Sequence, residues 1–147
     1  MKGGGIDAAY KGPTGNIILH LVASGGDVSV MKTLLENKEI SVHVDQRNRY
    51  GQSPIYVAAS KGHLEVIKML CEYGATPNLE TADDTIPLHK AAEGGYLEVV
   101  KYLVEESHSD DIHKKNKKGQ TPLDLARANE HLEVVKYLEE KAPVPKA

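Results

Sequence analysis

The sequence predicts an all-α solenoid in which four helix pairs stack side by side, with β-turn loops that project to one side. Two segments of the sequence recur at a nearly constant spacing along the chain, which is typical of a repeat protein. Within each repeat, the apolar residues follow helical spacing. The first segment occupies residues 51–59, 84–92 and 119–127, with a weaker copy at 15–23. If Ile18, Pro54, Pro87 and Pro122 are equivalent, the successive spacings are 36, 33 and 35 residues.

The first unit, residues 12–47, is the least regular. Its second segment begins at Gly26. The loop from Asn37 to Asn48 carries the residues by which this unit is longer than the shortest unit, so the loop is expected to bulge. Ile17 and Ile18 are apolar where a terminal unit needs a polar surface. Either the segment from Ile6 to Tyr10 covers them, or the chain was cut from a longer one. Residues 1–11 are otherwise expected to be a flexible lead or a partial cap.

The second unit, residues 48–80, shows the elements most clearly. Ser53 is a typical N-cap and Pro54 a typical first helical residue. The helix carries paired small residues and stops near Gly62, where a left-handed turn needs no Cβ. A second helix runs from Leu64 to Tyr73, and one stripe is expected to be buried, namely Leu64, Ile67 and Leu70.

The third unit, residues 81–115, repeats this pattern with Asp84 in the glycine position of its β-turn. Asp tolerates positive φ, so we expect the turn to survive. The second helix runs from Leu97 to Glu106, with Leu97, Val100 and Leu103 as its expected stripe. The extra residues from Glu106 to Asn116 are expected to lengthen the following loop.

The fourth unit, residues 116–140, has the features of a terminal cap. Thr121 and Pro122 start its first helix, and Arg127 stands where other units have a second small alanine, which would obstruct a further unit. Glu130 replaces the glycine between the two helices, so that turn is expected to be reshaped. Residues 141–147 contain Pro143 and Pro145, which cannot continue the helix, and are expected to be a tail.

These motifs resemble the ankyrin repeat family over residues 12–140. The resemblance depends on Thr121-Pro122-Leu123, Pro87-Leu88-His89, Gly62-His63 and the run Leu97-Glu98-Val99-Val100. It implies a β-turn followed by two antiparallel helices in each unit, stacked into a curved solenoid. It also implies that the concave side, made of loop tips and first helices, binds other proteins.

The composition narrows the possible functions. The 147 residues include 40% hydrophobic residues and have a formal net charge of -3, which argues against wholesale binding of nucleic acid or an anionic membrane. No apolar stretch approaches the length of a membrane span. The single cysteine, Cys71, cannot form an internal disulfide and is expected to be a small packed thiol, so a reducing compartment is the simpler expectation.

The histidines and acidic pairs do not predict catalysis or metal binding. His20 and His89 share one repeat position with Tyr56 and Asp124, and the resemblance implies hydrogen bonds within and between repeats for this position. His63 and His131 share the second segment's turn position. Asp83-Asp84 and Asp110-Asp111 lack the pattern of a calcium loop and are interpreted as solvated loop charge. No nucleophile elbow or phosphate-binding loop is present, so neither an enzyme nor a cofactor is expected.

The densest run of one charge is Lys114 to Lys118, before the fourth unit. Three interpretations stay open: a solvated turn, a contact for an acidic partner, or nuclear import or nucleic-acid contact. Nearby acidic residues and the lack of interleaved aromatic residues disfavour nucleic acid.

The candidate partner-binding residues lie at the positions that the resemblance assigns to loop tips and to the ends of the first helices. Their charge runs positive, negative, positive along the units, which predicts a partner with an acidic, basic, acidic order. Tyr50 beside Arg49 is the best single hot-spot candidate. The candidates are Arg49, Tyr50, Gln52, Lys61, Asp83, Thr85, Glu93, Lys117, Lys118, Gln120 and Asn129.

The resulting hypothesis is a non-enzymatic scaffold or adaptor that binds a protein partner, with no small-molecule substrate. The alternative is a regulatory segment of a larger enzyme or channel, whose groove binds in cis. We expect a monomer located in the cytoplasm, with the nucleus as the alternative.

Overall fold

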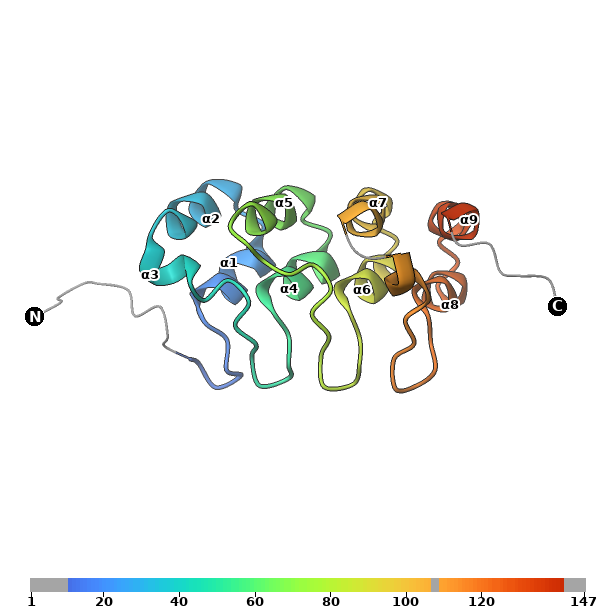
Figure 1. Cartoon of the computed structure of the whole chain (residues 1–147), viewed down its shortest axis with the longest axis horizontal. Coiled ribbons are helices and arrows are strands. Elements are labelled where there is room, and N and C mark those ends of the chain that lie inside the picture. Colours follow the sequence, from blue (N-terminus) through green and yellow to red (C-terminus); the bar gives the residue numbers. More distant parts are fainter. Residues whose placement is uncertain (1–10, 107–108, 142–147) are drawn as a thin grey trace, which may run out of the picture.

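The computed structural model describes residues 11–106 and 109–141, and within these ranges it contains helices and loops but no strand. Figure 1 shows an inner row of helices, an outer row, and loops that project from the inner row. The inner row comprises α1 (Ile18–Gly25), α4 (Pro54–Lys61), α6 (Pro87–Gly94) and α8 (Pro122–Ala128). The outer row comprises α2 (Val28–Leu35), α5 (Leu64–Glu72), α7 (Leu97–Glu106) and α9 (Leu132–Lys141). The predicted stack of four helix pairs is therefore confirmed.

The inner helices begin where the sequence predicts. The Oγ of Ser53 accepts a hydrogen bond from the N–H of Tyr56 (3.3 Å), and the Oγ1 of Thr121 accepts one from Asp124 (3.1 Å). A proline follows each cap, at a position whose N–H has no helical partner. Each cap thus satisfies a donor that the helix leaves unpaired.

The turn between the two helices of a unit has a residue with positive φ at the same position in all four units. Gly26, Gly62 and Gly95 have φ of 75°, 78° and 77°, and Glu130 has φ of 59°. The N–H of His131 bonds the carbonyl of Ala126 (3.0 Å), as that of His63 bonds Ala58 (3.0 Å). The expectation that Glu130 reshapes this turn is wrong, because the hydrogen bond holds Glu in the left-handed region.

The core lies between the two rows of helices. The paired small residues Ala58-Ala59 and Ala91-Ala92 are fully buried, which lets the inner helices approach closely. In the outer helices the buried sets are Val66, Ile67, Leu70 and Val99, Val100, Leu103. The expected stripe is corrected at one position in each helix, because Leu64 and Leu97 begin their helices and are only half-buried.

The extra residues of the first and third units fold into short helices instead of bulging loops. The first unit contains α3 (Lys38–Ser41), whose Ile40 is buried. The third contains the 3₁₀ helix η1 (Ser109–His113), whose Ile112 is buried except for 9% of its surface. One isoleucine in each insertion packs against the core, and this contact stabilises a helical turn that is too short to be stable alone.

The two ends of the array differ. In the fourth unit, the exposed Arg127 forms an ion pair with Glu139 of α9 (2.5 Å). In the first unit, Ile17 is buried. The segment from Ile6 to Tyr10 and the tail from residue 142 lie outside the described residues. None of the described helices combines the length and apolar character needed to span a membrane.

Candidate interaction surface

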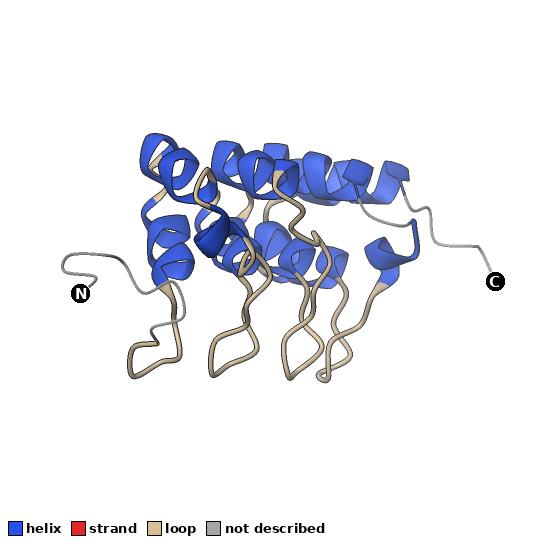
Figure 2. Cartoon of the chain, turned by 60° about the vertical axis from the view of Figure 1, so that its left-hand side comes forward, coloured by secondary structure: helices blue, strands red, loops and turns tan. Residues whose placement is uncertain are grey.

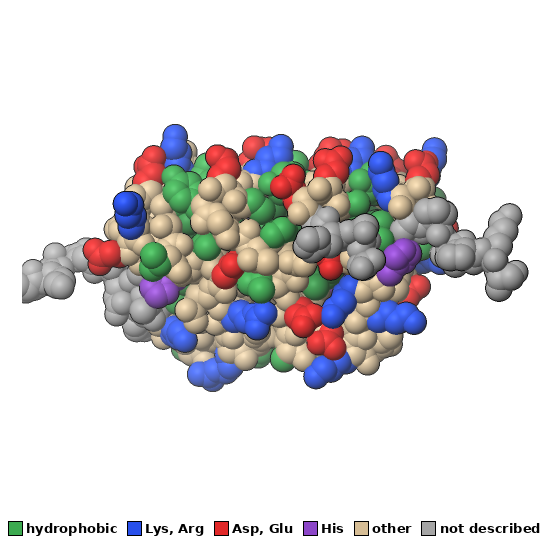
Figure 3. Space-filling model, viewed as in Figure 1, with side chains coloured by type: hydrophobic (Ala, Val, Ile, Leu, Met, Phe, Trp, Pro, Cys, Tyr) green, Lys and Arg blue, Asp and Glu red, His purple; other side chains and the backbone are tan. Residues whose placement is uncertain are grey.

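The surface that could receive a partner is formed by the exposed side of the inner helices and by the loops that project beyond them (Figure 2). We call it the groove face. Figure 3 shows basic and acidic side chains along the edge that the loops form. The residues that shape this face fall into two groups, a framework that fixes the loops and side chains that stay exposed.

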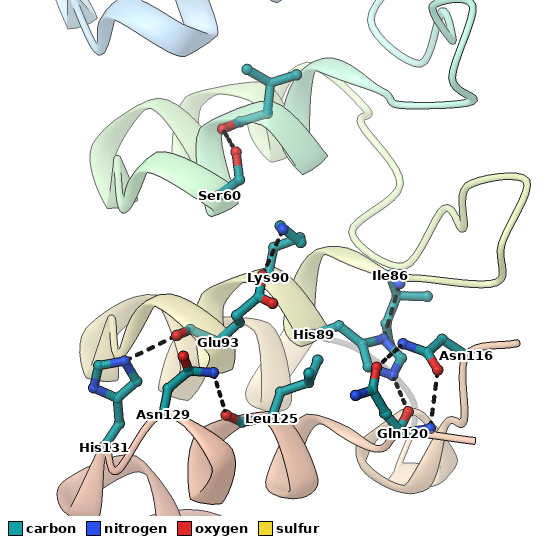
Figure 4. Close-up of polar contacts among 11 residues, drawn as sticks. Ser60, Ile86, His89, Lys90, Glu93, Asn116, Gln120, Leu125, Asn129 and His131 are labelled. Carbon is teal, nitrogen blue, oxygen red and sulfur yellow. Dashed lines mark hydrogen bonds and ion pairs between the residues drawn. The ribbon is translucent and has the colours of Figure 1, made fainter. Parts of the chain in front are cut away.

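Two buried histidines connect the inner helices α1 and α6 to the units that follow them. The Nδ1 of His20 accepts a hydrogen bond from the N–H of Ile17 (3.1 Å), so Nε2 carries the proton and donates to the carbonyl of Gln52 (2.7 Å). His89 does the same for Ile86 (3.1 Å), and its Nε2 lies 2.9 Å from the carbonyl of Gln120 (Figure 4). The carbonyl of Lys114 also lies 2.9 Å from this Nε2. The structural role predicted for these histidines is confirmed.

The histidines of the inter-helix turns connect the second and fourth units to the units before them. The Nε2 of His63 lies 3.1 Å from the carbonyl of Ser24, and that of His131 lies 2.9 Å from the carbonyl of Glu93 (Figure 4). Each ring covers the turn glycine of the preceding unit, and Tyr96 covers Gly62 in the same way. Among the described residues, no three His, Cys, Asp or Glu side chains are grouped so that they could hold a metal ion.

Stability is expected to fall in mild acid because of the two buried histidines. Burial is the largest cause that lowers the pKa of His20 and of His89 from the ordinary 6.5, and backbone hydrogen bonds oppose it. Below pH 6.5 these histidines are protonated in the unfolded chain but remain neutral in the folded chain. Their contribution to the free energy of unfolding is therefore fully present above pH 6.5 and is lost as the pH falls towards the lowered pKa. Thermal unfolding measured between about pH 8 and 5 should show a Tm that decreases with pH. The decrease should be roughly 4 °C for each 1 kcal/mol by which the free energy of unfolding falls. A constant Tm would contradict this.

Asparagines hold the second and fourth loop tips. The Oδ1 of Asn48 accepts from the N–H groups of Tyr50 and Gln52 (both 2.9 Å), and its Nδ2 donates to the Oε1 of Gln52 (2.9 Å). Asn116 forms the same bonds with Lys118 (2.9 Å) and with Gln120 (3.0 and 3.1 Å). The tips therefore have a fixed conformation before any partner arrives.

The third loop tip is held by Thr81. Its Oγ1 accepts from the N–H of Thr85 (3.3 Å) and donates to the carboxylate of Asp83. This bond is the main reason that the pKa of Asp83 is below its ordinary value. Asp84 follows with φ of 62°, so the turn survives as expected.

Neighbouring tips also bond one another through the backbone. The N–H of Arg49 donates to the carbonyl of Thr14 (2.9 Å), and that of Lys117 donates to Asp83 (2.9 Å). Of the candidate residues, seven are exposed, namely Arg49, Tyr50, Lys61, Asp83, Lys117, Lys118 and Asn129. Two of these side chains are hydrogen-bonded within the chain, since Asp83 accepts from Thr81 and the Nδ2 of Asn129 donates to the carbonyl of Leu125 (2.9 Å). Gln52, Glu93 and Gln120 are half-buried, whereas Thr85 is buried, with 6% of its surface exposed.

A cavity of about 160 Å³ hollows the groove face between the second, third and fourth units. It brings together five of the predicted residues, namely Asp83, Thr85, Glu93, Lys118 and Gln120. It also includes four that the sequence analysis missed: Tyr56, Lys90, Asn116 and Leu125. Tyr56 could have been found, because it departs from histidine at the position of His20 and His89.

Two loop charges belong to the framework. Lys114 forms an ion pair with Glu80 (2.7 Å), which is the main reason that its pKa is raised, so it is not a free cation of the lysine run. Asp111 accepts a hydrogen bond from the Nδ2 of Asn78 (3.0 Å). The interpretation of Asp111 as solvated loop charge is therefore wrong, because the carboxylate connects two units.

The outer helices present packed aromatic rings. The ammonium groups of Lys68 and Lys101 lie 5.9 Å from the ring centres of Tyr102 and Tyr137 respectively. Tyr102 bonds the half-buried Cys71, whose pKa burial raises. A thiol with a raised pKa is less reactive, as expected for a packed cysteine.

Comparisons with known proteins agree with this geometry. A family model described as "Ankyrin repeats (3 copies)" matches residues 2–81 and 76–146. Rabankyrin-5 of Homo sapiens is 33% identical over 70 residues, which cover 48% of this chain and 6% of that protein. Transient receptor potential cation channel subfamily A member 1 of Homo sapiens is 29% identical over 108 residues, or 74% of this chain and 10% of the channel. Ankyrin repeat and SOCS box protein 3 of Homo sapiens is 28% identical over 86 residues, which cover 58% of this chain and 16% of that protein. The chain thus spans a small part of each relative.

Proposed function

The chain belongs to the ankyrin repeat family, whose repeats are a general protein-interaction module, and from this premise we propose that it is a non-catalytic scaffold or adaptor that binds one protein partner on its groove face. One observation supports the groove face above the others. Its loop tips are fixed by hydrogen bonds at Asn48, Thr81 and Asn116, while Tyr50 has 58% of its surface exposed at one tip. Preorganisation of this kind lowers the entropy lost on binding.

The charges of the groove face determine the kind of partner that we propose. Arg49 lies at the second tip, Asp83 at the third, and Lys117 with Lys118 at the fourth, all exposed. A partner with an acidic, basic, acidic order would complement them. The proposal gives the histidines no catalytic part, because His20, His63, His89 and His131 all bond backbone carbonyls. We also propose a monomer located in the cytoplasm or the nucleus.

Variants of the tips test this proposal. Tyr50→Ala, and separately Lys117→Glu with Lys118→Glu, should each weaken partner capture about ten-fold. Tyr is a typical hot-spot residue, and the reversed charges would repel the acidic part of the proposed partner. The measurement is quantitative mass spectrometry of proteins retained from native cells by the tagged chain, together with a Tm for each variant.

Matched controls lie on the outer helices. Lys32→Glu with Lys136→Glu changes the net charge equally at exposed sites of α2 and α9, and Tyr73→Ala removes a tyrosine that follows α5. These controls should retain the partner. Equal loss in both sets, or a large fall in the Tm of the tip variants, would count against the groove face.

A second candidate is regulation in cis, as a segment of a larger enzyme or channel. It is supported by the lengths of the relatives, since the chain covers only 10% of the cation channel described above. The same tip variants would then release a neighbouring domain. Capture assays with the full gene product would distinguish the two.

A further inference from the structure

Three hydrogen bonds recur at the first and last junctions between neighbouring units. One comes from the buried histidine of an inner helix, one from the histidine of an inter-helix turn, and one from a backbone N–H at a loop tip. Between the first and second units, the bonded pairs are His20 with Gln52, His63 with Ser24, and Arg49 with Thr14. Between the third and fourth units, they are His89 with Gln120, His131 with Glu93, and Lys117 with Asp83. The four units are thus bonded together as two pairs.

All three bonds are missing at the middle junction, between the second and third units. Tyr56 takes the position of the inner-helix histidine, and Tyr96 takes that of the turn histidine. Among the described residues, neither tyrosine side chain forms a hydrogen bond across this junction. The N–H of Ala82, which is equivalent to those of Arg49 and Lys117, forms no bond to the second tip. The groove side of the middle junction therefore lacks the bonds that fix the other two junctions.

The polar contacts that do cross the middle junction belong to the outer helices and to the segments that follow them. Figure 1 shows the outer helices on the side of the stack away from the tips. The contacts are the hydrogen bonds of Tyr102 with Cys71 and of Asn78 with Asp111, the ion pair of Glu80 with Lys114, and the cation–π contact of Lys68 with Tyr102. The second and third units are therefore bonded to one another along this edge and not along the groove face.

Apolar packing holds the groove side of the middle junction together. Helix α4 packs against α6, and its Ile55 and Ala59 are fully buried. Apolar contacts have no preferred direction, whereas hydrogen bonds do, so the two units can tilt on this contact without breaking a hydrogen bond. The cavity of about 160 Å³ lies beside it, lined by Tyr56 of the second unit and by Asp83 and Thr85 of the third. This cavity leaves space on the groove face into which the two units can close.

We infer that the junction between the second and third units is a hinge, which opens and closes the groove face about the bonded edge at the outer helices. A repeat array is held by contacts between neighbouring units, so the junction with the fewest directional bonds bends first. Arg49 and Tyr50 move with the first pair of units, whereas Asp83 and Lys117 move with the second. A partner that spans both pairs selects one opening of the groove. The hinge is a property of the free chain and does not depend on the proposed function.

Distance distributions between two spin labels test the hinge in the free chain. One pair of labels joins the first and fourth tips, through Thr14→Cys and Lys117→Cys. The other pair joins α2 and α9, through Lys32→Cys and Lys136→Cys, which are exposed residues at equivalent positions. Both pairs span the same three junctions. The background is Cys71→Ser, which leaves only the introduced thiols and keeps a hydroxyl for the bonded tyrosine.

The tip pair should give a distance distribution about twice as wide as that of the outer pair, because the outer edge is the pivot and the tips lie far from it. Tyr56→His with Tyr96→His should narrow the tip distribution to the width of the outer one. Each new ring gains the kind of carbonyl partner that its equivalents have, namely Thr85 and Ser60. The matched control is Tyr50→His with Tyr73→His, which alters two exposed tyrosines and should leave the width unchanged.

The outcomes separate the hinge from the proposed function. Equal widths for the two label pairs would overturn the hinge, and this comparison requires no substitution at the junction. An unchanged tip width in the double histidine variant, shown by thermal unfolding to be folded, would overturn it as well. Neither result bears on partner capture by the tip variants, which is measured separately. If the tip and outer-helix variants retained the partner equally, the proposed function would fail and the hinge would stand.

Discussion

Replacement of Ala92 by arginine is expected to reduce the free energy of unfolding by about 4 kcal/mol or more, the largest effect of any single change considered. Ala92 is fully buried in α6, where the inner helices pack against one another. An arginine there must either bury an unpaired charge or force the third and fourth units apart. Urea unfolding of the purified chain measures the loss, and a split transition would show that the units had separated.

The chain itself contains the control for this change. Arg127 occupies the equivalent position in the fourth unit, where it is exposed and pairs with Glu139. Arg127→Ala should therefore change stability by at most about 1 kcal/mol, as is usual for exposed ion pairs. If Ala92→Arg were tolerated as well as Arg127→Ala, the units would not stack through these small residues.

Replacement of His89 by alanine is expected to cost about 3 kcal/mol. The imidazole is fully buried and bonds the N–H of Ile86 and the carbonyls of Lys114 and Gln120. Its removal leaves these groups unsatisfied and opens a void. The measurement is again urea unfolding, in which the midpoint should shift without a change in slope.

His63→Ala is the matched comparison for His89→Ala. His63 is half-buried, and its ring bonds one carbonyl among the described residues, that of Ser24 (3.1 Å). Because water can replace this bond, its loss should be clearly smaller, about 1 kcal/mol. Equal losses at the two positions would contradict the account of His89 as the bridge between the third and fourth units.

Features that depend on neighbours within a unit could be predicted from the sequence. The helix caps at Ser53 and Thr121 and the positive φ of Asp84 each follow from residue chemistry at a known repeat position. These are local properties. A repeat fold makes them easier to predict, because the same position can be compared between units.

Features that depend on packing could not be predicted. The short helix α3 exists because Ile40 reaches the core, and the left-handed turn at Glu130 exists because its neighbours keep their hydrogen bond. The cavity at Tyr56 was missed for the same reason. Its walls come from three units, and the sequence showed only that a tyrosine replaced a histidine.

The most direct test of the account is hydrogen–deuterium exchange of the chain with and without its captured partner. The account predicts added protection at the loop tips, residues 49–52, 82–85 and 117–120, and along α4, α6 and α8. Protection confined to the outer helices α2, α5, α7 and α9 would contradict the central claim that the preorganised groove face binds the partner.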